Sequence, residues 1–407
     1  MFEQYKGLRR ELYVLFIGRI MTNLGSMIWP MLTLILNKKI GLNASQVASC
    51  LLVFSLISLP VSLLGGKLTD RLNKRNIIVV CDSVSVICFL ICGFIPISMT
   101  SVILFAVAGL FQTVEWPAYD ALIADFTLPS DRQRAYSLSY LGANLGLVLS
   151  PTIGGLLFND YLNVAFIING LAIFLSTCLI FFLIKDVSRE ESEEDINEYE
   201  NELDNDTNAL GYIFGSRVLV VYLIALTLYQ IVYSPYSFLM PLEMGNAYGD
   251  QGSVLFGTLN SVNCLTVVLL TGFLTRVLSR VMETGKLLIG ISSVLAGLII
   301  FRVFLNHPAA IYIAIIIFTV GEIVTVLGSS PFISKRIPSN YRGRITSIMN
   351  VFTNVAISLF TKVFGFVYDR NGSLSAWILA YVIGILGIIA ILYLKVIDRK
   401  DYPALYK

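Results

Sequence analysis

Long apolar runs separated by short polar turns dominate this chain. A helix needs roughly 20 mainly apolar residues to cross a bilayer core about 30 Å thick, because each residue rises about 1.5 Å. Twelve segments meet this requirement, at residues 12–36, 44–65, 76–97, 101–125, 135–157, 162–185, 212–238, 252–275, 286–305, 309–334, 345–367 and 375–396. The pattern therefore predicts an all-α membrane protein with twelve transmembrane helices.

Composition and charge add an orientation to this prediction. Of the 407 residues, 56% are hydrophobic and only 14% are charged, whereas soluble domains carry about 25% charged residues. If both termini are cytoplasmic, most Lys and Arg residues fall in the cytoplasmic turns, as the positive-inside rule requires. We expect a multi-pass protein of the cell membrane with both termini in the cytoplasm.

An acidic stretch divides the chain into two halves that repeat each other. Residues 186–206 are rich in Glu and Asp and nearly free of long apolar runs, which indicates a solvated linker. Arg132, Arg134, Ser137 and Asn144 recur 210 residues later as Arg342, Arg344, Ser347 and Asn354. The sequence predicts two pseudo-symmetric six-helix bundles, 1–185 and 212–407, joined by a cytoplasmic linker, 186–211. A passive hinge is favoured over a regulatory segment.

Residues 65–75 read Gly-Gly-Lys-Leu-Thr-Asp-Arg-Leu-Asn-Lys-Arg, a charged turn between the second and third apolar runs. This turn resembles the G-x-L-a-D-r-x-G-r-k signature of the major facilitator superfamily. The matching positions are Gly66, Leu68, Asp70 and Arg71, followed by the basic pair Lys74 and Arg75. Asn73 replaces the second glycine, and it is expected to tolerate the left-handed conformation of a tight turn.

The resemblance implies a secondary transporter that alternates between inward-open and outward-open states. It also implies an inner gate made of Gly66, Asp70, Arg71, Lys74 and Asp125. In the family, an acid at the end of the fourth helix pairs with the basic residue of this turn, here Asp125 with Lys74. Asp70 would face the positive N-terminal end of the eleventh helix.

The fifth predicted helix contains Gly146, Pro151, Gly154 and Gly155. This spacing resembles the G-x-x-x-G-P-x-x-G-G element of superfamily exporters that exchange a substrate for protons, with Ser150 in place of the middle glycine. Small residues at these positions allow close helix packing, and Pro kinks the helix. The exporter element is favoured over a merely close-packed helix, although both explain the glycines.

Ionisable residues inside predicted spans are costly and need a reason. Glu115 and Asp120 lie in the fourth span, and Glu322 lies in the tenth. The sequence around Glu322 resembles the tenth-helix segment of bacterial multidrug:proton antiporters such as the lactococcal multidrug transporter. These three acids are candidate proton-coupling residues, because a cavity carboxylate can take up and release a proton. The alternative is a structural acid bonded to a neighbouring helix. Asp120 fits either coupling or the gate.

Candidate substrate-binding residues are polar or aromatic and lie inside spans. Tyr222, Tyr229 and Tyr233 share one face of the seventh predicted helix, where aromatic rings suit flat or cationic compounds. An interfacial aromatic belt is the alternative. Further candidates are Gln112, Trp116 and Arg19, and Arg19 is equally consistent with a snorkelling residue.

Several functional classes find no support in the sequence. It contains no P-loop, and its single His, His307, cannot form a metal site or a catalytic triad. We expect no enzyme activity, metal, cofactor or nucleic-acid partner, and a monomer whose partners are a small-molecule substrate, protons and lipid. Proton-coupled efflux of lipophilic or cationic drugs is favoured. Export or proton symport of one metabolite remains open, and a non-transporting receptor or scaffold is less well supported.

Overall fold

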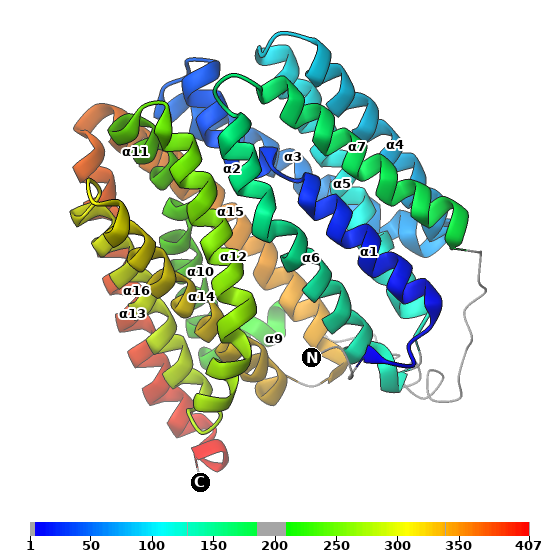
Figure 1. Ribbon diagram of the computed structural model, residues 1–407. Helices are drawn as coiled ribbons and strands as arrows, with labels where there is room; N and C mark the ends of the chain where they lie inside the picture. The colour runs from blue at the N-terminus through cyan, green and yellow to red at the C-terminus, as the bar shows by residue number, and fades with distance from the viewer. Residues whose placement is uncertain (1–4, 128, 185–208, 338, 407) are drawn as a thin grey trace. The chain divides into compact units, whose positions relative to one another are not determined.

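The computed structural model describes residues 5–127, 129–184, 209–337 and 339–406 (Figure 1). Of residues 70, 129, 130, 132, 133, 209 and 339–343 it describes the backbone only. Every regular element in the described residues is helical. Within these residues, twelve helical segments are long and apolar enough to cross a membrane, which confirms the predicted number of spans. The predicted linker 186–211 lies mostly outside the described residues.

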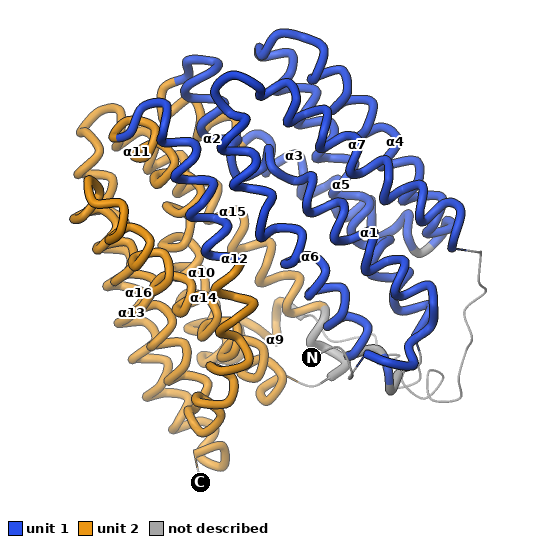
Figure 2. Tube along the Cα trace, viewed as in Figure 1, with its two compact units in different colours: residues 1–42, 53–200, 248–264 blue, residues 43–52, 201–247, 265–407 orange. Residues whose placement is uncertain are grey.

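The chain forms two compact units, which Figure 2 distinguishes by colour. The first comprises Met1–Leu42, Val53–Glu200 and Tyr248–Cys264. Its helices are α1 (Arg10–Gly25), α2 (Ile28–Leu34), η2 (Ile35–Lys39), most of α3 (Ala44–Arg71), α4 (Lys74–Phe94), α5 (Met99–Asp125), α6 (Pro129–Leu157), α7 (Leu162–Leu183) and the first half of α12 (Gln251–Val277). Within this unit α4 packs on α5 and α7, and α1 packs on α6 and α7.

The second unit comprises Asn43–Leu52, Asn201–Ala247 and Leu265–Lys407. Its helices are α9 (Ala209–Gly215), α10 (Arg217–Tyr233), η3 (Ser234–Tyr236), α11 (Leu239–Tyr248), α13 (Glu283–Val303), α14 (Pro308–Arg336), α15 (Ser339–Asn371), α16 (Ser373–Asp401), η4 (Pro403–Tyr406) and the remaining parts of α3 and α12. Here α13 packs on α14 and α16, and α10 packs on α15 and α16.

Two of the predicted spans are interrupted helices. The first breaks between α1 and α2, where the Ser26 hydroxyl donates to the Thr22 carbonyl at 2.9 Å. The seventh consists of α10, η3 and α11, and Pro235 lies in the short 3₁₀ turn that joins the two α-helices. Pro lacks a backbone N–H and cannot extend the ladder of helical hydrogen bonds. The structure corrects the bounds of both spans. The first runs over Arg10–Lys39 instead of 12–36, and the seventh over Arg217–Tyr248 instead of 212–238, because α9 is a separate short helix.

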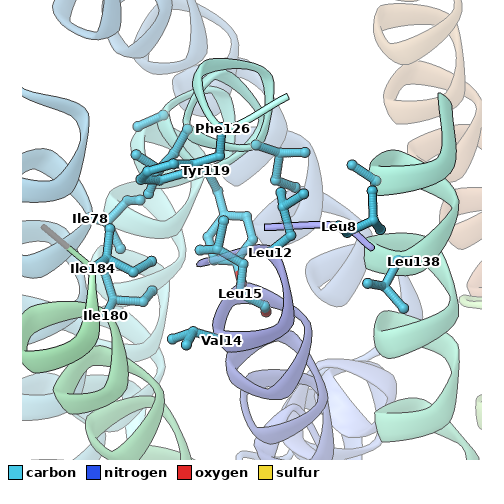
Figure 3. Close-up of a cluster of buried hydrophobic side chains, with 14 of the residues drawn as sticks. Leu8, Leu12, Val14, Leu15, Ile78, Tyr119, Phe126, Leu138, Ile180 and Ile184 are labelled. Atoms are coloured by element: carbon cyan, nitrogen blue, oxygen red, sulfur yellow. Dashed lines mark hydrogen bonds between the residues drawn. The ribbon is translucent and has the colours of Figure 1, made fainter. Parts of the chain in front are cut away.

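The core of the first unit is a cluster of apolar side chains from five helices. Leu15 of α1, Ile78 of α4, Tyr119 of α5, Leu138 of α6 and Ile180 of α7 are all buried in it (Figure 3). The Tyr119 hydroxyl donates to the Leu15 carbonyl, so the polar tip of this buried ring is satisfied. This cluster fixes the positions of α1 and α5, whose other faces line the site described below.

The small residues of α6 lie against neighbouring backbones of the same unit. A Cβ atom at Gly154 would lie 2.7 Å from the Met27 carbonyl oxygen, and one at Gly155 would lie 2.5 Å from that of Ser253. Gly146 is equally close to the Ile20 carbonyl. Pro151 is buried inside the same helix. These approaches leave no room for larger side chains, because buried backbones pack at close to van der Waals distance.

Candidate functional site

A cavity of about 620 Å³ opens among α1, α2, α5 and α6 of the first unit. It is large enough for a small organic ligand, whose sites usually measure about 300–1,000 Å³. The lining combines charged, amide and aromatic side chains: Arg19, Asn23, Trp29, Gln112, Glu115, Trp116, Asp120, Tyr136, Tyr140 and Asn144. Five predicted site residues are therefore brought together, namely Arg19, Gln112, Glu115, Trp116 and Asp120.

Among the side chains that the structure describes, Arg19 is the only cation that lines this cavity. Its guanidinium lies 3.9 Å from the Asp120 carboxylate and 4.3 Å from the centroid of the Tyr119 ring. The Trp116 ring is also within cation–π range, at 5.5 Å. The Arg19 side chain is 12% exposed, whereas the Asp120 side chain is 58% exposed. Arg19 is thus largely buried inside the unit, which favours a cavity residue over a snorkelling one.

Glu115 lies deeper than Asp120 and is only 4% exposed. Among the residues that the structure describes, its carboxylate has no hydrogen-bond or ion-pair partner at contact distance, and it interacts with Arg19 only through the longer-range field. Gln112 lies one helical turn away and accepts a long hydrogen bond from the Trp29 indole at 3.4 Å. The carboxylate is therefore open to a proton or a ligand in the cavity.

The second unit holds the predicted acid Glu322 beside an aromatic cluster. The Tyr229 and Tyr233 rings are 6.2 Å apart, and Tyr233 is 5.0 Å from Phe318 of α14. The Tyr233 hydroxyl is hydrogen-bonded to the Glu322 carboxylate, and Tyr229 interacts electrostatically with the same acid. Two of the three predicted tyrosines are thus grouped around the predicted coupling acid.

Tyr222 occupies a different environment from the other two tyrosines. Its ring stacks on Phe332 at a centroid distance of 4.3 Å and is 1% exposed. It shares a small void with Tyr229 and Thr325, too small for an organic ligand. This position indicates a packing residue, so the predicted contact of Tyr222 with substrate finds no support in the geometry.

The predicted gate pair is present at the adjoining ends of α4 and α5. Lys74 Nζ lies 2.6 Å from Asp125 Oδ2. Gly66 and Arg71 lie on the last turns of α3; Arg71 is exposed and nothing surrounds Gly66 closely. The side chain of Asp70 lies outside the described residues. The structure therefore establishes one ion pair of the predicted gate.

The expected left-handed conformation at Asn73 is wrong. Its backbone is extended, with φ −62° and ψ 117°, and its side chain accepts a hydrogen bond from the Asn76 amide at 3.1 Å. Asn73 is the N-cap of α4, a position at which Asn is among the preferred residues. Asn replaces the family glycine here because it caps the next helix.

An ion pair of reversed sign occupies the corresponding place in the second unit, and the sequence analysis missed it. Lys335 of α14 lies 2.6 Å from Glu283 of α13, and Lys335 stands 210 residues after Asp125. The repeat offset alone would have pointed to it. In the first unit the acid belongs to the later helix, and in the second unit it belongs to the earlier one.

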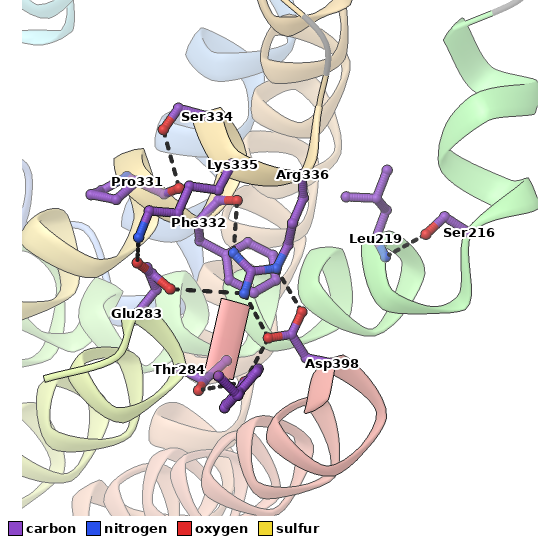
Figure 4. Close-up of polar contacts among 11 residues, drawn as sticks. Ser216, Leu219, Glu283, Thr284, Pro331, Phe332, Ser334, Lys335, Arg336 and Asp398 are labelled. Carbon is purple, nitrogen blue, oxygen red and sulfur yellow. Dashed lines mark hydrogen bonds and ion pairs between the residues drawn. The ribbon is translucent and has the colours of Figure 1, made fainter. Parts of the chain in front are cut away.

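This second pair is part of a larger buried network, shown in Figure 4. Arg336 donates twice to Asp398, each time at 2.6 Å, and both side chains are completely buried. Tyr406 donates to the same carboxylate at 2.6 Å. Burial, together with the neighbouring Asp398, raises the pKa of Tyr406, so its hydroxyl remains a donor. The network holds α14 against α16.

A further acid that the sequence analysis missed is Asp82, near the middle of α4. It is 4% exposed and lies outside the lining of the cavity. The insertion-cost argument that selected Glu115 applies equally to Asp82, since both lie inside predicted spans. That argument would have found it.

In the part of the chain that the structure describes, twelve helices are long and apolar enough to cross a membrane, and the first unit contains a cavity of ligand size, as expected of a multi-pass membrane protein. The chain belongs to the Major Facilitator Superfamily, whose family model matches residues 14–361. It is therefore a secondary transporter of that family.

Two characterised relatives are similar over large parts of the chain. A Na(+), Li(+), K(+)/H(+) antiporter of Planococcus maritimus is 25% identical over 374 residues, covering 83% of this chain and 85% of the relative. The quinolone resistance protein NorA of Staphylococcus aureus is 26% identical over 236 residues, covering 56% and 59%.

Solved transporter structures share the fold. A POT family transporter in complex with 5-aminolevulinic acid superposes with a TM-score of 0.77 at 14% identity, over 99% of this chain and 98% of the other. A D-xylose-proton symporter gives a TM-score of 0.70 at 13% identity, over 94% and 96%. These likenesses establish the architecture and leave the substrate open, because one fold serves many functions.

Proposed function

We propose that the protein exports lipophilic or cationic compounds from the cytoplasm in exchange for protons. The proposed transport units are the six-helix bundles 1–185 and 212–407, joined by the linker 186–211, with both termini in the cytoplasm. A monomer in the cell membrane would alternate between inward-open and outward-open states. The name of the relative NorA, a quinolone resistance protein, supports export of drug-like compounds.

The observation that carries this proposal is the buried Glu115 carboxylate in a cavity of ligand size. A substrate cation in the cavity would be attracted to Glu115 and Asp120, the same groups that would carry a proton. Arg19 offsets part of their negative charge, so that the cavity need not hold two uncompensated anions. Substrate and proton therefore compete for one site, which is the condition for exchange.

The aromatic cluster of the second unit supports recognition of flat cationic compounds. Tyr229 and Tyr233 flank Glu322, so a cation near the acid would also lie against ring faces. Cation–π contacts tolerate many geometries and contribute about 0.5–2 kcal/mol each. In this proposal Glu322 is the second coupling acid, and its bond to Tyr233 breaks when substrate or proton arrives.

The Lys74–Asp125 pair is proposed to act as a gate together with Gly66, Asp70 and Arg71. Its partners are 27% and 15% exposed, so the pair is partly solvated. Ion pairs in contact with solvent contribute little stability, which suits an element that must open in every cycle. The reversed pair Lys335–Glu283 is proposed as its counterpart in the second repeat.

Exchange of a monovalent metal cation for protons is a second candidate. The relative from Planococcus maritimus carries that activity in its name and matches most of this chain. Carboxylate and amide oxygens suit hard cations, and the cavity offers both in Glu115, Asp120 and Gln112. Export or proton symport of one metabolite is less well supported, because no observation selects a particular compound.

Transport into proteoliposomes under an imposed pH gradient tests the proposal. One arm contains ethidium or tetraphenylphosphonium, and the other contains Na⁺, Li⁺ or K⁺. Uphill movement of the organic cations that needs the pH gradient and fails in Glu115→Gln supports drug export. Asp160→Asn, an exposed acid outside the cavity, is the matched control and should behave as wild type. Uphill movement of Na⁺, Li⁺ or K⁺ without movement of the organic cations would refute drug export and support exchange of metal cations for protons.

A further inference from the structure

Asp82 is a buried acid that the proposed transport cycle does not yet use. It lies on α4, which packs between α5 and α7, and it is 4% exposed. A charge at this place in a spanning helix is expensive, and purely structural needs are usually met by uncharged residues. Its presence inside a spanning helix therefore calls for an account of its protonation.

The hydroxyl beside Asp82 has two acceptors within hydrogen-bond distance. Thr177 Oγ1 of α7 lies 2.7 Å from Asp82 Oδ2 and 2.8 Å from the Ile173 carbonyl oxygen. A hydroxyl donates only one proton. With Asp82 protonated, the acid can donate to Thr177 Oγ1 while the Thr177 hydroxyl donates to the Ile173 carbonyl oxygen.

The same geometry accommodates the charged form. The Thr177 hydroxyl can rotate and donate to the Asp82 carboxylate, because the Ile173 carbonyl keeps its helical N–H partner. The arrangement thus has two states that differ by one proton and by the direction of a single hydroxyl. The Ser85 hydroxyl, one turn along α4, lies 3.1 Å from both the Cys81 and the Ala108 carbonyl oxygens, so its one proton is used there and not at Asp82.

The charged and titratable groups that act on Asp82 come from three helices. They are Arg19 of α1, Glu115 and Tyr119 of α5, and Cys81 of α4 itself. Glu115 is the important one, because simultaneous negative charge on two carboxylates in a low-dielectric region is unfavourable. Arg19 acts on both acids. A cation in the cavity would therefore change the electrostatic potential at Asp82.

We propose that Asp82, with Thr177 as its reversible partner, is a second proton-binding site of the first unit, linked electrostatically to Glu115. A proton bound at Asp82 leaves as Asp82 becomes a carboxylate, and the Thr177 hydroxyl turns toward it. The Asp82 O–H bond is the only covalent bond that breaks, and its proton leaves. The hydrogen bonds from Asp82 to Thr177 and from Thr177 to Ile173 are replaced by one from Thr177 to Asp82. The site itself follows from the local geometry, whereas its part in transport rests on the proposed proton-coupled function.

Infrared difference spectroscopy of the full chain in nanodiscs tests the site without transport. The carbonyl stretch of a protonated carboxylic acid is separate from carboxylate bands. We expect a wild-type band that disappears as the pH rises and is missing in Asp82→Asn. Glu115→Gln should leave this band in place but change the pH at which it disappears. Identical bands in wild type and Asp82→Asn over the whole pH range would overturn the proposal.

Thr177 supplies a second pair of variants in case Asp82→Asn does not fold. Thr177→Val removes the hydroxyl and should shift the frequency of the Asp82 band, whereas Thr177→Ser should preserve it. A band unaffected by Thr177→Val would show that the acid does not donate to this hydroxyl, and the two-state arrangement would be wrong.

Transport stoichiometry then separates the site from the proposed function. For each proton exchanged, a pH difference of one unit sustains about a tenfold substrate gradient, so losing one proton lowers that limit about tenfold. We expect this loss in Asp82→Asn. If wild type shows no proton-driven transport but keeps the band, the proposed function fails and the site stands. If transport is proton-driven, and Asp82→Asn sustains the same substrate gradient and shows the same infrared band as wild type, then the proposed proton site is wrong and the proposed function stands.

Discussion

Removal of the Asp398 carboxylate should destabilise the second unit more than any other single change in its polar network. The Arg336 guanidinium is fully buried and loses both of its 2.6 Å hydrogen bonds in Asp398→Ala. Its remaining neighbours include the Phe332 carbonyl at 3.2 Å, a Glu283 oxygen at 3.8 Å, and the Phe332 and Tyr402 rings at 3.9 and 5.8 Å. Breaking a buried pair from one side typically costs about 3–5 kcal/mol, because it leaves a desolvated charge without its partner. We predict a loss of that size.

A matched control lies three residues further along the same helix. Asp401 pairs with Arg217, but this pair is solvent-exposed, so Asp401→Ala should change stability far less. The double variant Arg336→Met with Asp398→Leu should regain much of the loss, because it removes both charges and fills similar volume. The assay is the free energy of unfolding in mild detergent, followed by circular dichroism during titration with a denaturing detergent. Equal losses in Asp398→Ala and Asp401→Ala would refute this reasoning.

Three functional predictions concern the coupling acid, the aromatic cluster and the gate. Glu322→Gln should abolish uphill export yet allow some downhill flux, because the amide keeps the shape and loses the proton; undiminished uphill export would exclude Glu322 from coupling. Tyr229→Ala and Tyr233→Ala should each weaken binding of a flat cation by about 0.5–2 kcal/mol, as measured by equilibrium dialysis. Phe at either position should preserve binding. An equal loss of affinity with Phe and with Ala would show that the hydroxyl, and not the ring face, contacts the substrate. Exchanging Lys74 and Asp125 should retain more transport activity than Asp125→Lys alone, and indistinguishable rates for the two would dismiss the ion pair as a gate element.

The spans were predictable because a bilayer imposes a minimum apolar length, and this requirement is local in sequence. The cavity residues followed from the same physics. Arg19, Glu115 and Asp120 are costly inside a membrane, and the structure gathers them around one cavity. The Lys74–Asp125 pair was predictable because the turn resembles the family signature, in which an acid at the end of the fourth helix pairs with this basic residue.

What remained hidden depends on contacts between helices. Tyr222 shares a helical face with Tyr229, and the stacking of its ring on Phe332 of another helix could not be predicted from that face. The partnership of Asp82 with Thr177 joins residues 95 positions apart. Asn73 was misjudged because the turn was considered without the helix that follows, whose first turn uses the asparagine as its cap.

The central claim is that substrate and proton compete for the same carboxylates. The most direct measurement is the number of protons released when tetraphenylphosphonium binds to the purified protein in weakly buffered solution, followed with a pH indicator. We predict proton release that saturates with binding in wild type and is reduced in Glu115→Gln and in Glu322→Gln. Saturable binding to wild type without any proton release between pH 6 and 8, a range of about one unit on either side of neutrality, would contradict the account.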